Sequence, residues 1–169
     1  MEHLWSPWRL QYVTGGTART TCVFCDADVD EGQAALVVYR GDAAYVILNL
    51  FPYNNGHLMV VPARHIASLV EATTEELCDL MALTRLAEQV LREAYQPHGL
   101  NVGMNLGKAA GAGVADHLHI HLVPRWTGDT NFMTTVGESR VLPETLDATA
   151  ARLRPLFAAA SASLEGTRS

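Results

Sequence analysis

The sequence predicts a single α+β domain with a mainly antiparallel sheet, and three observations lead to this fold class. The chain has 169 residues, enough for one compact core. Hydrophobic residues make up 49% of the chain and charged residues 18%, a balance typical of a folded globular domain. Short apolar segments precede and follow one long amphipathic segment, and this order is typical of an α+β fold.

Five short segments are predicted to form the strands of the sheet. They are rich in Val, Ile, Leu or Tyr, and turn-forming residues separate the first three, with Gly41-Asp42 at the first turn. The first two strands are therefore expected to pair as a hairpin. We expect strands at 35–40, 44–50, 57–62, 100–105 and 117–124.

One long helix is predicted between the third and fourth strands. Thr73 and Glu76 have the spacing of a capping box, in which two side chains satisfy unpaired backbone donors at a helix start. Pro97 and Gly99 are expected to end the helix, and Cys78 is expected to be a small core residue within it. The predicted buried face consists of Leu77, Leu80, Met81, Thr84, Ala87, Leu91 and Ala94.

The two ends of the chain are expected to lie outside the main body of the domain. The first residues are rich in aromatic side chains and lead into a glycine-containing link. The region beyond Pro143 is helical in composition, and its last residues are expected to fray. We therefore expect an N-terminal arm over 1–21, the domain over 22–145, and a C-terminal helix with a frayed tail over 146–169.

Composition narrows the possible partners. The net charge of −6 and the pI near 5.6 disfavour binding to long nucleic acids, although a small anionic ligand remains possible. No apolar run approaches the ~20 residues of a membrane span, and no signal peptide is evident. Three cysteines are too few for a disulfide framework. A cytoplasmic protein without a membrane partner is expected.

The segment 117–122 alternates histidine with a hydrophobic residue. Because side chains on a strand point to opposite faces, this pattern predicts that the three imidazoles project to one side and Leu118, Ile120 and Leu122 to the core. One alternative is an ordinary solvated edge strand. Another is direct metal binding by the triplet, with Asp116 or Asp129 as the carboxylate, although neither has persuasive spacing.

The sequence resembles the histidine triad (HIT) family, whose motif is His-x-His-x-His followed by two hydrophobic residues. Residues 117–123 match this motif, 49–65 resemble the family's nucleotide-binding hairpin, and 105–117 resemble its phosphate loop. The loop and the segment after the triad resemble the bacterial branch that includes diadenosine tetraphosphate phosphorylases and related hydrolases. The resemblance covers roughly 22–125, and it implies a HIT-like sheet of about five antiparallel strands.

The resemblance also implies catalytic roles for three histidines. The middle triad residue, His119, is expected to attack the α-phosphorus of a nucleotide and form a covalent nucleotidyl-histidine. His121 is expected to position the phosphate or the leaving group, and His57 to lie behind the pocket. A neutral imidazole held through one nitrogen presents a single lone pair at the other, which suits such a nucleophile.

Further residues are expected to bind the substrate. Asn49 matches a polar family residue near the ribose, while Leu48, Phe51 and Leu58 are expected to line the base slot. The glycine-rich loop can bring backbone N–H groups close to phosphate oxygens. The expected substrate contacts are Asn49, Leu48, Phe51, Asn105, Gly111, Ala112, Gly113, His121 and Trp126.

A structural zinc ion is a further implication of the resemblance. In family members that carry the Cys22-x-x-Cys25 pair, the remaining ligands correspond to His65 and His117. Two thiolates and two imidazoles form a closed tetrahedral shell, which is the mark of a structural site. An empty reduced dithiol is the alternative. No organic cofactor is expected.

The acceptor of the nucleotide stays open at this stage. In the phosphorylase pattern a serine occupies the place of Gly113 and a glycine that of Ala112, so this chain lacks one hydroxyl donor. Inorganic phosphate or water can complete the reaction, and Lys108 and Arg125 are either phosphate-attracting or solvated charges. The alternative function is a nucleotide-binding sensor or scaffold with weak turnover. Family members are usually dimers that join their sheets, so a homodimer is expected.

Overall fold

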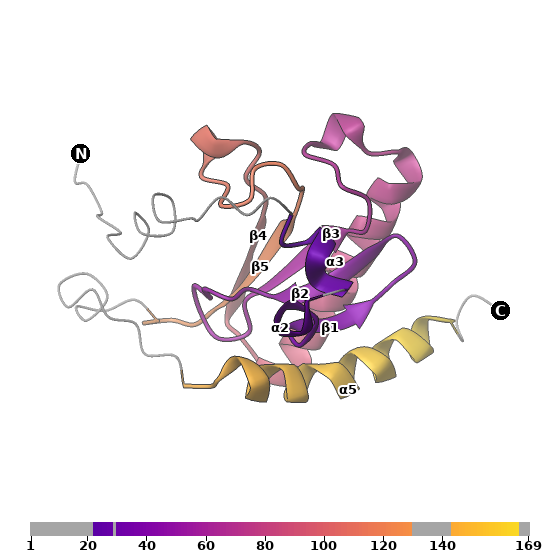
Figure 1. The fold of residues 1–169 in the computed structure, drawn as a ribbon. Helices are drawn as coiled ribbons and strands as arrows, with labels where there is room; N and C mark the ends of the chain where they lie inside the picture. Colours follow the sequence, from indigo (N-terminus) through magenta and orange to yellow (C-terminus); the bar gives the residue numbers. More distant parts are fainter. Residues whose placement is uncertain (1–21, 29, 130–142, 166–169) are drawn as a thin grey trace, which may run out of the picture.

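A computed structural model describes residues 22–28, 30–129 and 143–165 of the chain (Figure 1). The predicted N-terminal arm and the last four residues of the tail lie outside these ranges. Among the described residues, no helix combines the length and the apolar composition that a bilayer crossing requires.

The sheet has five strands, and every neighbouring pair is antiparallel. Their order across the sheet is β1-β2-β3-β5-β4, so the last strand in the sequence inserts between β3 and β4. This result confirms the prediction of an α+β fold with about five antiparallel strands. The strands are β1 (Val37–Arg40), β2 (Ala44–Leu48), β3 (Leu58–Pro62), β4 (Gly99–Gly103) and β5 (Ile120–Arg125).

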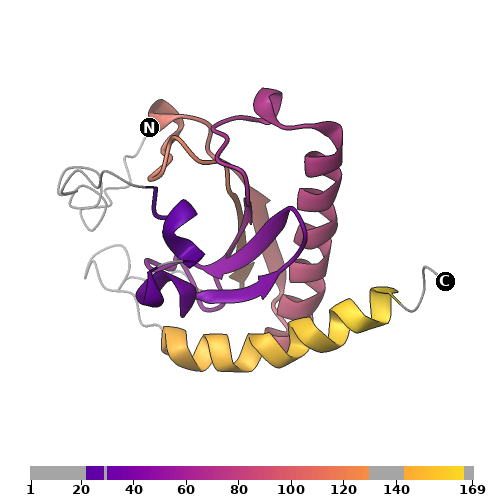
Figure 2. The ribbon, with the colours of Figure 1, turned by 45° about the vertical axis from the view of Figure 1, so that its right-hand side comes forward.

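Helices cover the sheet from different sides. The long helix α3 (Thr74–Tyr95) packs against one face, whereas the short η1 (Cys25–Asp28) and α2 (Glu31–Ala34) lie over the other (Figure 2). Two further 3₁₀ turns, η2 (Leu69–Glu71) and η3 (Lys108–Ala110), precede α3 and follow β4. The segment that carries both cysteines of the Cys-x-x-Cys pair therefore lies on the face opposite α3.

Helix α3 begins and ends where its sequence predicts. The capping box is complete, because Thr73 Oγ1 accepts the Glu76 N–H and the Glu76 carboxylate accepts the Thr73 N–H. Gln96 closes the helix in a left-handed conformation with φ 46°. The capping box fixes the end of α3 that follows η2, and Gln96 closes the end that precedes β4.

The predicted buried face of α3 is wrong in two places. Met81 is 59% exposed and Cys78 is exposed, whereas Leu83, Leu86 and Val90 are buried. Because α3 packs against both the sheet and α5 (Leu146–Glu165), its buried arc is wider than one stripe and is rotated away from Met81.

Helix α5 covers the β1 edge of the sheet. Its Leu153 and Phe157 are fully buried, and the Phe157 ring stacks on Tyr39 at 5.5 Å between centroids. The Arg154 guanidinium donates to the carbonyl oxygens of Ala35 and Val37, at 2.6 and 3.1 Å from Nη2. The boundaries predicted for the arm, domain and tail stay predictions, although α5 shares one hydrophobic core with the sheet.

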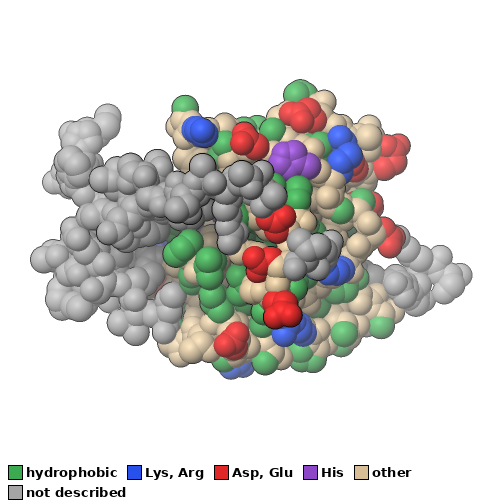
Figure 3. All heavy atoms as spheres, in the orientation of Figure 1, with side chains coloured by type: hydrophobic (Ala, Val, Ile, Leu, Met, Phe, Trp, Pro, Cys, Tyr) green, Lys and Arg blue, Asp and Glu red, His purple; other side chains and the backbone are tan. Residues whose placement is uncertain are grey.

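Side chains of both charges are scattered over the face shown in Figure 3, where acidic groups lie between apolar ones. The net charge of −6 agrees with this distribution. The visible described surface carries no continuous basic area of the kind that binds a nucleic-acid backbone.

Candidate active site and metal centre

The histidine segment lies at the start of β5. The strand begins at Ile120, so His117 and His119 precede it and only His121 lies within it. Leu118, Ile120 and Leu122 are buried as predicted, but His117 and His119 are also buried, at 1% and 4% exposure. The imidazole side of this segment is therefore enclosed by protein and is not a solvated strand face.

His119 has one ring nitrogen fixed by the backbone. Its Nδ1 lies 2.8 Å from the carbonyl oxygen of His117, and because a carbonyl can only accept, Nδ1 carries the proton. Burial lowers the pKa of His119, which outweighs the opposite effect of this hydrogen bond. A neutral ring protonated at Nδ1 leaves a lone pair on Nε2, which is the electronic state that a nucleophile needs.

His57 lies behind His121 and is directed at it. The Tyr53 N–H donates to His57 Nδ1 at 3.0 Å, so the proton of the neutral ring must be on Nε2. His57 Nε2 lies 3.0 Å from His121 Nδ1 and therefore donates to it. Burial, and then the charges of His121 and His119, lower the pKa of His57 to about 3.

The direction of this bond determines where His121 holds its proton. Since His121 Nδ1 accepts from His57, a neutral His121 is protonated at Nε2. The ring centroids of His119 and His121 lie 4.8 Å apart. An unprotonated Nε2 on His119 thus lies on a ring next to His121, whose Nε2 can donate a proton.

Four predicted metal ligands come together beside the triad. One ligand atom from each of Cys22, Cys25, His65 and His117 lies within 4.8 Å of all the others. Cys22 Sγ is 3.3 Å and Cys25 Sγ is 3.6 Å from His117 Nδ1, and Cys25 Sγ is 3.2 Å from His65 Nδ1. Bond lengths of ~2.0–2.3 Å in a tetrahedral zinc shell place ligand atoms roughly 3.3–3.8 Å apart, so the group fits such an ion.

The first triad histidine is oriented as a ligand. Its Nε2 donates to the Pro62 carbonyl oxygen at 2.9 Å, which leaves the lone pair of Nδ1 facing the two sulfurs. Burial, together with Cys22, raises the pKa of the Cys25 thiol, and a bound cation would oppose this shift. Within the described residues this is the one group of its kind, and it contains only His117 of the triad. This grouping does not support metal binding by the whole triplet.

Phe24 lies between the Cys22, Cys25, His65 and His117 group and His119. It lies between the two cysteines in the sequence, and its ring centroid is 5.1 Å from that of His119 and 5.5 Å from that of His117. Sequence reasoning missed this residue, because an aromatic side chain inside a Cys-x-x-Cys pair carries no signal for the far end of the chain.

The predicted substrate contacts occupy two loops. In the first, Leu48 is buried and Phe51 is 54% exposed. Asn49 is half-buried; its Oδ1 accepts the Phe51 N–H at 2.9 Å and its Nδ2 lies 3.4 Å from His57 Nδ1. The structure therefore places Asn49 beside His57.

The second loop joins β4 to β5 and contains Asn105, Gly111, Ala112 and Gly113. Gly111 ends η3 with φ 91°, a left-handed conformation that favours glycine. Gly113 is exposed, and Asn105, Gly111 and Ala112 are half-buried. Trp126, just after β5, is half-buried, and its backbone N–H donates to Asp129 Oδ2 at 3.2 Å.

Arg125 is held by an acidic partner. Its Nε and Nη2 donate to the two carboxylate oxygens of Asp129 at 2.7 and 2.8 Å. Asp129, considered above as a metal ligand, is therefore the partner of a guanidinium. Its Oδ2 also accepts a bond of 2.8 Å from Asn54 Nδ2, a contact that the sequence did not suggest.

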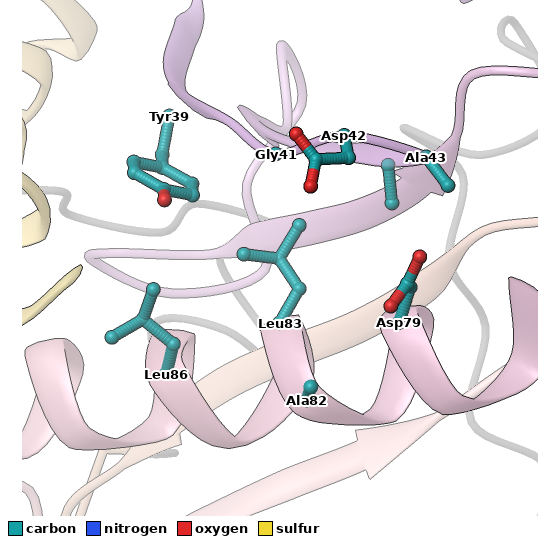
Figure 4. Close-up of a pocket in the computed structure, with 9 residues that line it drawn as sticks. Tyr39, Gly41, Asp42, Ala43, Asp79, Ala82, Leu83 and Leu86 are labelled. Atoms are coloured by element: carbon teal, nitrogen blue, oxygen red, sulfur yellow. The ribbon is translucent and has the colours of Figure 1, made fainter. Parts of the chain in front are cut away.

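A separate cavity of about 170 Å³ lies between the β1–β2 hairpin and α3 (Figure 4). Asp42 and Asp79 face it from the hairpin and the helix, while Tyr39, Leu83 and Leu86 form its apolar part. None of its lining residues belongs to the histidine or metal groups.

Comparison with known proteins identifies similar sequences and structures. A family model described as "HIT domain" matches residues 31–128. The AP-4-A phosphorylase of Mycobacterium tuberculosis is 43% identical over 154 residues, covering 86% of this chain and 79% of that protein. A bis(5'-nucleosyl)-tetraphosphatase [asymmetrical] of Schizosaccharomyces pombe is 34% identical over 93 residues, covering 55% of this chain and 50% of its own length.

Solved structures show the same architecture. A Zn-bound histidine triad family protein from Mycobacterium smegmatis superposes with a TM-score of 0.67 at 28% identity, covering 85% of this chain and 97% of that one. A hypothetical histidine triad nucleotide-binding protein from Sulfolobus tokodaii gives a TM-score of 0.64 at 26% identity, with coverages of 85% and 94%.

Proposed function

Since this chain belongs to the HIT family, we propose that it cleaves dinucleoside polyphosphates through a covalent nucleotidyl-histidine on His119. The observation that carries the proposal is the bond from His119 Nδ1 to the His117 carbonyl, which leaves Nε2 as the free nucleophilic nitrogen. The 43% identity to an AP-4-A phosphorylase supports the choice of substrate.

The first step forms one bond and breaks one. His119 Nε2 donates its lone pair to the α-phosphorus, and the bond between that phosphorus and the bridging oxygen breaks as the nucleotide leaves with the electron pair. The Nδ1–H bond to His117 spreads the positive charge that develops on the ring. Attack by the acceptor on the same phosphorus then returns the electron pair to His119.

His121 and His57 act on the leaving group. His121 Nε2–H can donate to the departing phosphate oxygen, because His57 keeps His121 Nδ1 as an acceptor. His57 does not touch the substrate in this scheme. It works through His121, and its pKa of about 3 keeps it neutral throughout the physiological range.

The two loops hold the nucleotide. Phe51 contacts the base above the buried Leu48, and Asn49 reaches the ribose with the lone pair of Oδ1 that Phe51 N–H does not use. The loop that contains Asn105, Gly111, Ala112 and Gly113 binds the phosphates, with the Gly113 N–H and Asn105 as the donors. The N–H groups of Gly111 and Ala112 donate to the carbonyl oxygens of Lys108 and Gly107 and so hold the loop in shape. Trp126, directly after β5, is proposed as a further contact with the substrate.

Inorganic phosphate is the acceptor that the 43% identical phosphorylase supports, and Gly113, in the place of a serine, favours water. The deciding experiment incubates the protein with diadenosine tetraphosphate, with and without phosphate, and separates the products. ADP plus ATP marks phosphorolysis and AMP plus ATP marks hydrolysis, both through attack on the α-phosphorus. Two ADP would mark cleavage between the two middle phosphates, which does not pass through a nucleotidyl-histidine, and would contradict the proposed route. No turnover under either condition would contradict the proposal and favour a nucleotide-binding module.

The metal group is proposed to hold a structural Zn²⁺ on Cys22, Cys25, His65 and His117. The donor set, its closed shell and the His117–Pro62 bond support this assignment. The ion would link the turn before η1 to the segment that leads into β5. It would take no part in cleavage of the nucleotide. The likeness to a Zn-bound family structure supports the same metal.

A homodimer is proposed to form through the β4 edge of the sheet. Among the strands of the described residues, β4 has β5 as its one neighbour, and Val102 within β4 is 49% exposed. The β1 edge is obstructed, since α5 packs against β1 and Arg154 binds the carbonyl oxygens of Val37 and of Ala35 just before the strand. Sedimentation should give two copies for the wild type and one for Val102→Lys, while Val70→Lys, at a residue 94% exposed on η2, should leave the dimer intact.

A further inference from the structure

We infer that Asn54 and Asp129 are positioning residues for the His57–His121 pair, an inference that rests on the proposed function of that pair. Neither side chain belongs to the histidine segment or the metal group. Together with Arg125 they form a buckle between the loop before β3 and the end of β5. This set of three residues is called the Asn54 buckle below.

The buckle is a dense hydrogen-bond network. Asn54 Nδ2 donates to Asp129 Oδ2 at 2.8 Å and to the Pro124 carbonyl oxygen at 3.1 Å. Arg125 holds both oxygens of the same carboxylate, and the Asp129 side chain is only 12% exposed. Charge-assisted bonds to a carboxylate shielded from water define the position of Asn54 closely.

The buckle lies beyond the point where the two strands stop pairing. The register between β3 and β5 ends with Leu58 opposite Leu122. Asn54 Nδ2 reaches the β5 carbonyl of Pro124, and so fastens the loop to the strand that carries His121. The contact joins residues 70 positions apart in the sequence.

A shift in the position of Asn54 would change the hydrogen bonds of His57. The Asn54 carbonyl oxygen accepts the His57 N–H at 3.3 Å, and the residue before it, Tyr53, supplies the N–H that fixes His57 Nδ1 as an acceptor. The Asn49 amide nitrogen lies 3.4 Å from the same Nδ1 and is the weaker of the two donors. When the shorter bond from Tyr53 is lost, the His57 proton can occupy Nδ1. His57 Nε2 would then accept from His121 Nδ1, and His121 Nε2 would lose the proton that faces the leaving group.

The decisive measurement reads these protons directly. In protein labelled with ¹⁵N-histidine, two-bond ¹⁵N–¹H correlation spectra at neutral pH distinguish the Nδ1–H and Nε2–H forms of each ring. The wild type should show His57 and His121 both protonated at Nε2. Asn54→Ala should convert both rings to a mixture of forms, whereas Asn55→Ala, in the same loop, should keep the wild-type pattern because Asn54 retains its bonds.

Activity supplies the second measurement. Asn54→Ala should lower kcat about tenfold or more with KM changed less than about threefold, because proton delivery is impaired and binding is not. Asp129→Ala leaves the loop sequence intact but removes the acceptor, so it should give the same spectra. The double variant should be no worse than either single variant, because all three lose one shared bond.

Wild-type spectra for both Asn54→Ala and Asp129→Ala would overturn the inference, as would losses of kcat that multiply in the double variant. Since the spectra need no substrate, they decide the role of the buckle even if the wild-type protein fails to cleave dinucleoside polyphosphates. That failure would overturn the proposed function alone.

Discussion

The Nε2 atom of His57 lies 3.0 Å from the Nδ1 atom of His121, and the Tyr53 N–H on the far side of His57 decides which of them donates. This backbone amide, with the more distant Asn49 amide at 3.4 Å from the same His57 nitrogen, thereby sets the protonation of two imidazoles in series. This arrangement requires an enclosed site, because water would offer both rings other partners.

The buried His57 should make the stability of the protein depend on pH. Its folded pKa of about 3 is below the unfolded value of 6.5, so the unfolded chain binds a proton that the folded chain refuses. This part of the stability is complete above about pH 6.5 and is lost as pH falls toward 3, by up to about 1.4 kcal/mol per pH unit. The lowered pKa values of His117 and His119 act in the same direction.

Urea unfolding of the wild type and His57→Gln at several pH values measures this effect. The variant should lose stability less steeply between about pH 6.5 and 5, where few carboxylates titrate. Equal slopes for the two proteins would show that His57 accepts a proton as readily when folded as when unfolded.

Replacement of the nucleophile should abolish turnover. His119→Ala should lower kcat at least about 10³-fold, or about 4 kcal/mol of barrier, because the attacking nitrogen is lost. Acid quenching of the wild-type reaction should leave a nucleotide mass on the peptide that contains His119. His98→Ala, at an exposed histidine outside the triad, is the control. A loss below about tenfold would rule out the covalent route.

Loss of the metal should lower the free energy of unfolding of the protein. Zinc should be present at about one ion per chain. Treatment with a chelator, or Cys25→Ser, should cost about 3 kcal/mol, or about 6–12 °C in Tm for a chain of this length. Cys78→Ser is the matched control, because Cys78 is exposed on α3 and lies outside the metal group. Equal Tm values for the two variants would argue against a structural ion.

Gly56 is expected to tolerate no side chain. Its φ is 71°, and a Cβ there would lie 2.8 Å from the Tyr95 ring. Gly56→Ala should therefore destabilise the protein by about 1–3 kcal/mol, and it should disturb His57, the next residue in the sequence. Gly99→Ala, where a Cβ meets nothing within 4 Å, should change stability little. Thermal unfolding of the two variants measures the difference, and similar Tm values would contradict the steric argument.

Local sequence patterns predicted the elements well because the physics of each element is local. The capping box at Thr73, the turn at Gly41 and the stop at Pro97 depend on neighbours within a few residues. The buried face of α3 was less predictable. Met81 and Cys78 fit the helical period, but the direction of the buried arc is determined by α5, which the period cannot place.

Only part of the candidate site could be predicted from motifs. The metal group joins Cys22 and Cys25 to His65 and His117 as expected, because the resemblance supplied their pairing. Asn54 and Asp129 gave no such signal, because their bond depends on how a loop meets the end of β5, 75 residues later. The side-chain hydroxyl or amide of a lone polar residue has many possible partners, and only the packed structure selects one.

The two unequal edges of the sheet bear on aggregation. At the β1 edge of the sheet, Arg154 binds the carbonyl oxygens of Ala35 and Val37. Among the described residues, no side chain binds the β4 edge in the same way. Two copies that meet along β4 would bury the unpaired strand edge of each copy. Only the two β1 edges, which Arg154 obstructs, would then face outward. Growth would stop at that pair, so the same contact that joins two copies would also protect them from forming fibres.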